Sequence, residues 1–119
     1  MLTKDEQIKA LLTGRAFELA THTLGCSRMT SHSYSEVFTV SRPDIDDYVQ
    51  RYGIPMDRVS TADDHSEGIH FVRRGSTWVL YWQERGARYD EHEFTDEATA
   101  QRTLVDSLLN TSGTGIRYA

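Results

Sequence analysis

The stretch Ile69-His70-Phe71-Val72-Arg73-Arg74-Gly75-Ser76-Thr77-Trp78-Val79-Leu80-Tyr81-Trp82 decides the fold. Two runs of β-branched and aromatic residues, 69–73 and 77–82, flank Arg74-Gly75-Ser76, and this pattern is typical of a β-hairpin. Successive side chains of a strand point to opposite faces. Both faces of the second run are apolar, with Trp78, Leu80 and Trp82 on one and Val79 and Tyr81 on the other. We therefore expect a central strand that is covered on at least part of both sides.

The residues after the hairpin predict a third strand and a closing helix. A turn over 84–88 leads into a more polar run, 89–94, whose acidic residues suit an exposed sheet edge because charges discourage further strand pairing. Thr95-Asp96-Glu97 then offers a helix cap, with negative charge near the positive end of the helix. Apolar residues recur at helical spacing from there to Asn110.

The residues before the hairpin predict two helices and a strand. A capping box at Thr3-Lys4-Asp5-Glu6 and helical apolar spacing predict one helix that ends near Leu24, before Gly25. The run 36–40 is β-branched and aromatic, which predicts a strand. A second helix is expected from Pro43 to Gly53. The stretch 60–68 is polar, acidic and aperiodic, and it predicts an exposed loop.

The predicted element order is α-β-α-β-β-β-α. This order indicates an α+β fold, with a single antiparallel sheet of three to four strands and helices packed mainly on one face. The chain has 119 residues and shows no linker or internal repeat. We therefore expect residues 1–119 to form a single domain.

The composition excludes several functional classes. Eighteen acidic residues against 13 basic ones give a net charge of −5, which argues against general affinity for nucleic acid. One cysteine, Cys26, cannot form an internal disulfide framework and indicates a reducing compartment. No apolar run is long enough for a membrane span, and the first residues do not resemble a signal peptide. We therefore expect a small soluble cytoplasmic domain.

The acidic residues are concentrated in the middle of the chain. Between Glu36 and Glu67 there are eight acidic residues and three arginines, so this segment has the net charge of the whole chain. One interpretation is a solvated face with a polar loop. The other is a patch that binds a basic protein partner, because such a patch speeds encounter and selects partners. The candidate contact residues are Asp44, Asp46, Asp47, Asp63, Asp64 and Glu67.

The sequence has only weak patterns of catalytic or metal-binding residues. No pair of histidines has the spacing of a zinc site with another strong ligand, so we expect no metal and no cofactor. Cys26 with His22 or His32 could form a nucleophilic dyad, but a lone cysteine near a helix end is typical of an inert thiol. The acidic pairs are typical of solvated carboxylates. Aromatic residues of the hairpin could stack on single-stranded nucleic acid only beside a basic groove, and a hydrophobic core explains them more simply. We expect no enzymatic activity.

The second half of the chain has a characteristic pattern, Val72-Arg73-Arg74-Gly75-Ser76-Thr77-Trp78-Val79-Leu80-Tyr81-Trp82-Gln83-Glu84-Arg85-Gly86, continued by Phe94-Thr95-Asp96-Glu97-Ala98 into the helix that ends at Leu108-Leu109. This pattern resembles small bacterial immunity proteins of polymorphic toxin systems, including those of contact-dependent growth inhibition. The resemblance covers roughly residues 68–110 and a similar N-terminal helix, and 42–67 have no counterpart.

This resemblance implies a binding protein without catalysis. Its partner would be the C-terminal domain of one cognate toxin, often a basic nuclease, which it would block in the cell that produces both. The alternative is a small regulatory or scaffold domain that binds another protein or a small ligand. The sequence leaves monomer and dimer open, with the monomer favoured.

Overall fold

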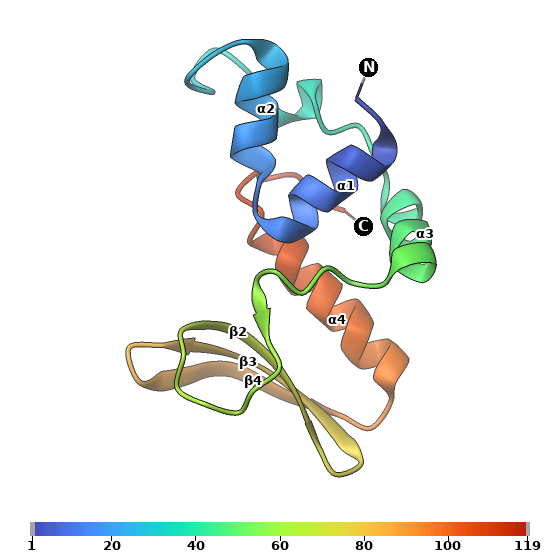
Figure 1. The fold of residues 1–119 in the computed structure, drawn as a ribbon, viewed down its shortest axis with the longest axis vertical. Helices are drawn as coiled ribbons and strands as arrows, with labels where there is room; N and C mark the ends of the chain where they lie inside the picture. The colour runs from blue at the N-terminus through green and yellow to red at the C-terminus, as the bar shows by residue number, and fades with distance from the viewer. Residues whose placement is uncertain (1, 119) are drawn as a thin grey trace. The chain divides into compact units, whose positions relative to one another are not determined.

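The computed structural model describes residues 2–118 and has an α+β fold, with α-helices, a short 3₁₀ helix and a four-stranded sheet (Figure 1). The chain divides into two compact units. The first, called the helical unit, runs to Pro55 and resumes at Ser107. The second, the sheet unit, is Met56–Asp106. The expectation of a single domain stays a prediction.

The N-terminal helix is interrupted, so the prediction of one helix up to Leu24 is wrong. Helix α1 is Lys4–Thr13 and helix α2 is Ala16–Leu24. Thr3 and Glu6 form the expected capping box at the start of α1. Gly14 ends α1 in the left-handed conformation, with φ 75°, which side chains with a Cβ adopt only at a cost. The glycine therefore ends a helix instead of only weakening one.

Residues 36–40 do not form the predicted strand. The short 3₁₀ helix η1, Tyr34–Glu36, occupies the start of this stretch. The backbone N–H of Thr39 donates to the side-chain oxygen of Gln7 on α1 over 2.8 Å. Val37, Phe38 and Val40 are buried. These β-branched and aromatic residues are thus buried in the helical unit without forming a strand. This is possible because β propensity reflects packing as much as backbone preference.

Helix α3 is Arg42–Tyr52 and confirms the prediction for this segment. The Ser41 hydroxyl caps the N–H of Asp44, and the Asp44 carboxylate accepts the N–H of Ser41 over 2.9 Å. Ile45 and Tyr48 face the interior of the helical unit, and the helix ends at Gly53.

The sheet has strands β1 (Val59–Ser60), β2 (Gly68–Arg74), β3 (Thr77–Glu84) and β4 (Ala87–Phe94), in that spatial order. β2, β3 and β4 form the predicted antiparallel meander with β3 inside it. β1 pairs with β2 in parallel, so the sheet is mixed and the expectation of a purely antiparallel sheet is wrong. A two-residue strand is too short to show an alternating pattern in the sequence.

The strand register separates the side chains of the hairpin into two faces. His70 lies opposite Tyr81 and Val72 opposite Val79, so these four residues share one face, which we call the tyrosine face. The other face has Phe71 opposite Leu80. Val79 is fully buried and Tyr81 is 2% exposed, which confirms that β3 is covered at its centre.

Helix α4, Glu97–Asn110, begins and ends close to the predicted positions. The Asp96 carboxylate accepts the N–H of Thr99 over 3.0 Å and satisfies one of the unpaired donors of the first turn. Ala100, Leu104 and Leu108 are fully buried. No helix formed by residues 2–118 is long and apolar enough to cross a bilayer.

The break between α1 and α2 can be tested by whether one substitution raises or lowers the free energy of unfolding. Gly14→Ala places a Cβ on a left-handed backbone, so we expect the free energy of unfolding in urea to fall by about 1–2 kcal/mol. Gly14→Asn is the control, because asparagine tolerates this conformation better and should lose less. One continuous helix through residue 14 would instead gain about 1 kcal/mol from alanine.

Candidate functional site

The six acidic candidates divide between the two units. Three lie on α3 in the helical unit: Asp44, Asp46 and Asp47. Three lie in the acidic loop, defined as residues 61–67 between β1 and β2: Asp63, Asp64 and Glu67. The sheet unit has eleven acidic and six basic residues and therefore the whole net charge of −5, whereas the helical unit has seven of each.

The carboxylate of Asp44 is part of the helix start. Besides the N–H of Ser41, it accepts a hydrogen bond from Lys4 Nζ over 3.2 Å and so links α3 to α1. The bonds from Ser41 and Lys4 hold the pKa of Asp44 below its ordinary value. The Asp44 carboxylate therefore caps the start of α3 and links this helix to α1.

The other two carboxylates of α3 lie on its exposed side. Asp46 pairs with Arg42 over 2.8 Å, and Asp47 pairs with Arg51 over 3.0 Å, each one helical turn apart. The side chains of Asp46 and Asp47 are 55% and 63% exposed. The pair of Asp47 with Arg51 is exposed on both sides and contributes little stability, so Asp47 can exchange its partner at small cost. Arg42, the partner of Asp46, is only 13% exposed.

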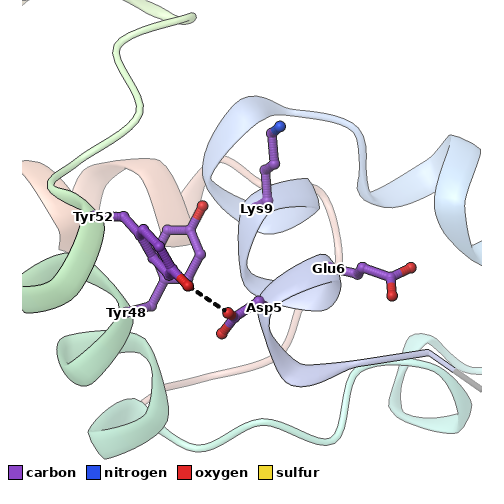
Figure 2. Close-up of a pocket in the computed structure, with 5 residues that line it drawn as sticks. All are labelled: Asp5, Glu6, Lys9, Tyr48 and Tyr52. Carbon is purple, nitrogen blue, oxygen red and sulfur yellow. Dashed lines mark hydrogen bonds between the residues drawn. The ribbon is translucent and has the colours of Figure 1, made fainter.

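A pocket of about 250 Å³ lies between α1 and α3 (Figure 2). Its lining residues are Asp5, Glu6, Lys9, Tyr48 and Tyr52. The rings of Tyr48 and Tyr52 are 4.9 Å apart, and Tyr52 is 62% exposed. The pocket thus presents an aromatic wall to solvent, which suits a flat or cationic side chain of a partner.

Asp5 is already paired inside this pocket. It forms an ion pair with Arg51 over 3.0 Å and accepts the Tyr52 hydroxyl over 3.2 Å. The hydrogen bond from Arg51 is the main reason why the pKa of Asp5 is lowered. A ligand in the pocket would therefore meet a neutralised carboxylate.

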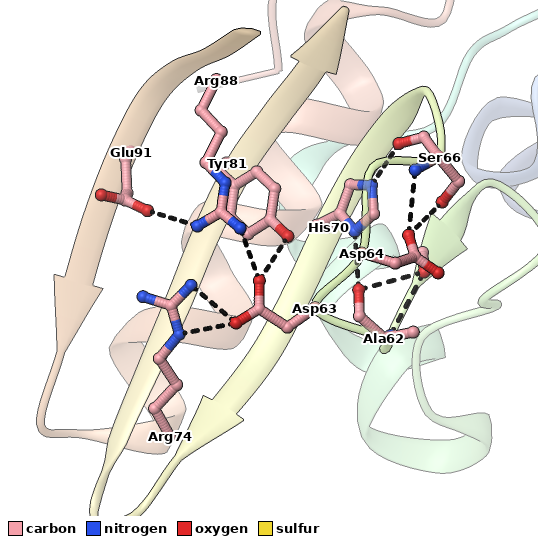
Figure 3. A network of polar contacts seen from close by, with 10 residues as sticks. Ala62, Asp63, Asp64, Ser66, His70, Arg74, Tyr81, Arg88 and Glu91 are labelled. Atoms are coloured by element: carbon pink, nitrogen blue, oxygen red, sulfur yellow. Dashed lines mark hydrogen bonds and ion pairs between the residues drawn. The ribbon is translucent and has the colours of Figure 1, made fainter. Parts of the chain in front are cut away.

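The acidic loop is fixed to the sheet by the carboxylate of Asp63 (Figure 3). One oxygen accepts the Tyr81 hydroxyl over 3.0 Å and Arg88 Nη2 over 2.7 Å. The other accepts Arg74 Nη2 over 2.9 Å. These donors, the Tyr81 hydroxyl first, hold the pKa of Asp63 below its ordinary value. The four residues are called the Asp63 hub below.

Tyr81 is the buried member of the hub. Its ring stacks on His70 with centroids 4.7 Å apart, and the Arg88 guanidinium lies 4.3 Å from its centroid on the ring face. Burial, and then the bond to Asp63, raise the pKa of Tyr81. The phenol is therefore a hydrogen-bond donor and is poorly suited to act as a base.

His70 holds both ends of the acidic loop. The side chain is fully buried, with Nδ1 2.8 Å from the carbonyl oxygen of Ala62 and Nε2 2.6 Å from that of Ser66. Within the loop, Asp64 accepts the Ser66 hydroxyl over 2.6 Å, which lowers the pKa of Asp64. Glu67 accepts the N–H of Arg85 over 3.3 Å. All three acidic loop candidates thus make contacts within the chain.

A β-bulge brings a second carboxylate to the hub. Leu80 pairs with His92 and Trp82 with Tyr89, so two residues of β4, Asp90 and Glu91, lie opposite Tyr81. Asp90 has a left-handed backbone with φ 52°. Because of the extra residue, Arg88 and Glu91 meet over 3.3 Å, although strict alternation would place them on opposite faces.

β4 is the exposed edge of the sheet, as predicted. Every residue from Ala87 to Glu93 is exposed, and Tyr89 is 50% exposed. Within residues 2–118, neither Asp90 nor Glu93 forms a salt bridge. Asp90 and Glu93 on this edge therefore carry negative charge without an ion-pair partner among the described residues.

Sequence reasoning does not identify Arg74, Arg88, Tyr81 and His70 as members of a polar network. The contacts between Asp63 and its arginines span 11 and 25 residues, so no local spacing reveals them. The one available signal is the alternation that places His70 opposite Tyr81 on a hairpin. The bulge gives no such signal, because Asp90 replaces the glycine that a left-handed position favours.

The described residues give little support for a metal site or for a catalytic dyad with Cys26. No group of three or more His, Cys, Asp or Glu residues between 2 and 118 could hold a metal ion. Cys26 is partly exposed, and His32 contacts Glu36 over 3.1 Å. Comparison of the chain with protein-family models, curated proteins and solved structures finds no match.

The Asp63 hub predicts acid sensitivity of the sheet unit. Because folding lowers the pKa of Asp63, its contribution is complete above the ordinary value of 3.8 and is lost as pH falls through the lower folded value. Asp63→Asn should therefore reduce the free energy of unfolding at neutral pH. When the pH falls from neutral to about 3, the variant should lose less of this free energy than the unmodified protein loses. The measurement is chemical unfolding across this range.

Asp90→Asn is the matched control. It removes the same charge from an exposed carboxylate without an ion pair, so its pH profile should follow that of the unmodified protein. Identical profiles for the two variants would contradict the role of Asp63.

Proposed function

We propose that the chain is an immunity-type protein that binds a cognate bacterial toxin domain and blocks its active or substrate-binding surface. The observation that carries the proposal is the exposed acidic edge strand β4 in a unit that has the whole net charge of −5. The resemblance of roughly residues 68–110 to immunity proteins, carried by 72–86 and 94–98, supports it. The proposed site of action is the cytoplasm of the producing cell.

The edge strand has two features that suit a basic protein surface. Asp90 and Glu93 make no salt bridge to another described residue, so a basic partner need not displace an arginine to reach them. Tyr89 adds a half-exposed ring of the kind that is enriched at interfaces. Such charges mainly speed association and fix orientation.

In the proposed mechanism, the chain only has to cover the surface of the toxin and carries out no catalysis. A nuclease binds phosphate through clustered Lys and Arg, so its substrate surface is basic. An acidic strand that covers this surface neutralises the charge and excludes nucleic acid. We therefore propose a toxin of the nuclease class.

The six residues expected from the sequence have a secondary role in this proposal. Asp46 and Asp47 are the most accessible of them, but each must first leave its arginine. Asp63 holds the acidic loop and would contribute through the position of Asp64 and Glu67.

A regulatory or scaffold function is the second candidate. The aromatic pocket between α1 and α3 favours it, because Tyr52 is largely exposed there. A partner that binds this pocket should lose affinity on Tyr52→Ala and be indifferent to the charge of β4.

The partner is identified first by affinity capture from the lysate of the host, followed by mass spectrometry. Recovery of the C-terminal region of one large secreted protein supports the proposal, provided that the purified region is toxic and the chain abolishes its activity. A partner without toxic activity contradicts the proposal.

The surface is then tested with two variants that each remove two negative charges. Asp90→Asn/Glu93→Gln should slow association with the toxin domain about threefold to tenfold at low salt, with little change in dissociation. Asp46→Asn/Asp47→Asn, on α3, is the matched control and should have a smaller effect. Unchanged association of the β4 variant would contradict the assignment.

A further inference from the structure

Two side chains of the sheet unit have buried polar atoms without a hydrogen-bond partner among residues 2–118. These atoms are Nη1 of Arg58 and both Nε2 and Oε1 of Gln83. Gln83 is 1% exposed, so its whole amide group is withdrawn from bulk water. The large majority of buried polar atoms in proteins are hydrogen-bonded, and a buried amide with neither atom bonded is therefore suited to a partner from outside the chain.

The strand pairing brings the two residues to one corner of the sheet. Gln83 of β3 lies opposite Gly68 of β2. On the other side of β2, the parallel strand β1 begins with Val59 beside Ile69. Arg58 directly precedes Val59, so its backbone lies next to Gly68. We call Arg58, Gly68 and Gln83 the Gly68 corner, because the glycine separates the other two residues.

Gly68 leaves room between its neighbours. A Cβ built on this residue would have no surrounding atom within 4 Å. The backbone has φ 117°, a conformation that only glycine adopts readily, so the position has to remain without a side chain. Gly68 is partly exposed, and the space beside it is therefore accessible to a small solute.

The guanidinium of Arg58 supplies a positive charge that the chain does not neutralise. Within residues 2–118, Arg58 forms no salt bridge. Burial lowers its pKa, and no nearby carboxylate offsets this effect. Glu67, which precedes Gly68 in the chain, instead accepts the backbone N–H of Arg85 over 3.3 Å. The corner is therefore suited to an anion.

The three unpartnered atoms define the chemistry of this anion. Nη1 of Arg58 and Nε2 of Gln83 donate hydrogen bonds, and Oε1 of Gln83 accepts one. The complementary group has a negative charge, at least two acceptor oxygens and one O–H. Dihydrogen phosphate has this combination, and so does a carboxylate with a neighbouring hydroxyl group.

We propose that the Gly68 corner binds a small oxyanion that carries its own hydrogen-bond donor. The oxygens of the anion accept the N–H groups of Arg58 and Gln83, and its O–H donates to Oε1 of Gln83. An anion without the donor binds more weakly, because the buried Oε1 then stays unpaired. The inference goes beyond the proposed function, since this site needs neither a toxin domain nor β4.

The site is tested by NMR titration of ¹⁵N-labelled protein at constant ionic strength, with glycolate, acetate and inorganic phosphate as separate probes. Glycolate differs from acetate by one hydroxyl group, so it should bind about tenfold more tightly and shift the side-chain amide signals of Gln83 in a saturable way. Tighter binding of phosphate than of acetate would also support the site and would identify phosphate as the anion. The inference is overturned if neither glycolate nor phosphate binds more tightly than acetate.

Two variants locate the binding. Arg58→Met and Gln83→Met keep the length of the side chain and remove its polar end. Arg58→Met should abolish saturable binding, and Gln83→Met should remove the preference for the anion with a donor. Arg73→Met, at an exposed arginine of β2, is the matched control and should retain both. Unchanged affinity of Arg58→Met would overturn the site, and the titration of the unmodified protein decides if a variant does not fold.

Discussion

The bond between the carboxylate of Asp63 and the hydroxyl of Tyr81 is the contact on which the rest of the sheet unit depends. Tyr81 is almost fully buried, so its hydroxyl needs an acceptor, and Asp63 is the one that the loop supplies. The same carboxylate forms ion pairs with Arg74 and Arg88, and Glu91 supplies a second negative charge to Arg88. The Asp63 side chain thus satisfies a buried donor, pairs with two cations and fixes a polar loop to the sheet.

The distribution of charge gives the two acidic surfaces of the sheet unit different uses. In the loop, the carboxylates are bound to Tyr81, arginines and backbone N–H groups, so their charge is compensated within the chain. On β4, Asp90 and Glu93 have no such partner among residues 2–118, and the bulge directs Glu91 to Arg88. The edge strand therefore has the uncompensated charge on which the proposal of a basic partner rests.

Local signals in the sequence are sufficient for most elements and insufficient for the network. The capping box at Thr3 and the hairpin around Gly75 are properties of a few neighbouring residues, and the structure contains both. The prediction of one helix through Gly14 is wrong because a glycine inside an apolar helical pattern can either be tolerated or end the helix. The prediction of a strand at 36–40 is wrong because burial and strand pairing favour the same side chains. The hub and β1 depend on contacts between distant segments, which one sequence does not reveal.

A double-mutant cycle between Asp63 and Tyr81 tests the central contact most directly. The free energy of unfolding is measured for the unmodified protein, Asp63→Asn, Tyr81→Phe and the double variant. If the two side chains act through their shared hydrogen bond, the double variant will lose less stability than the two single losses added together. Strict additivity would show that Asp63 and Tyr81 stabilise the sheet unit independently, and it would contradict the central role of their hydrogen bond.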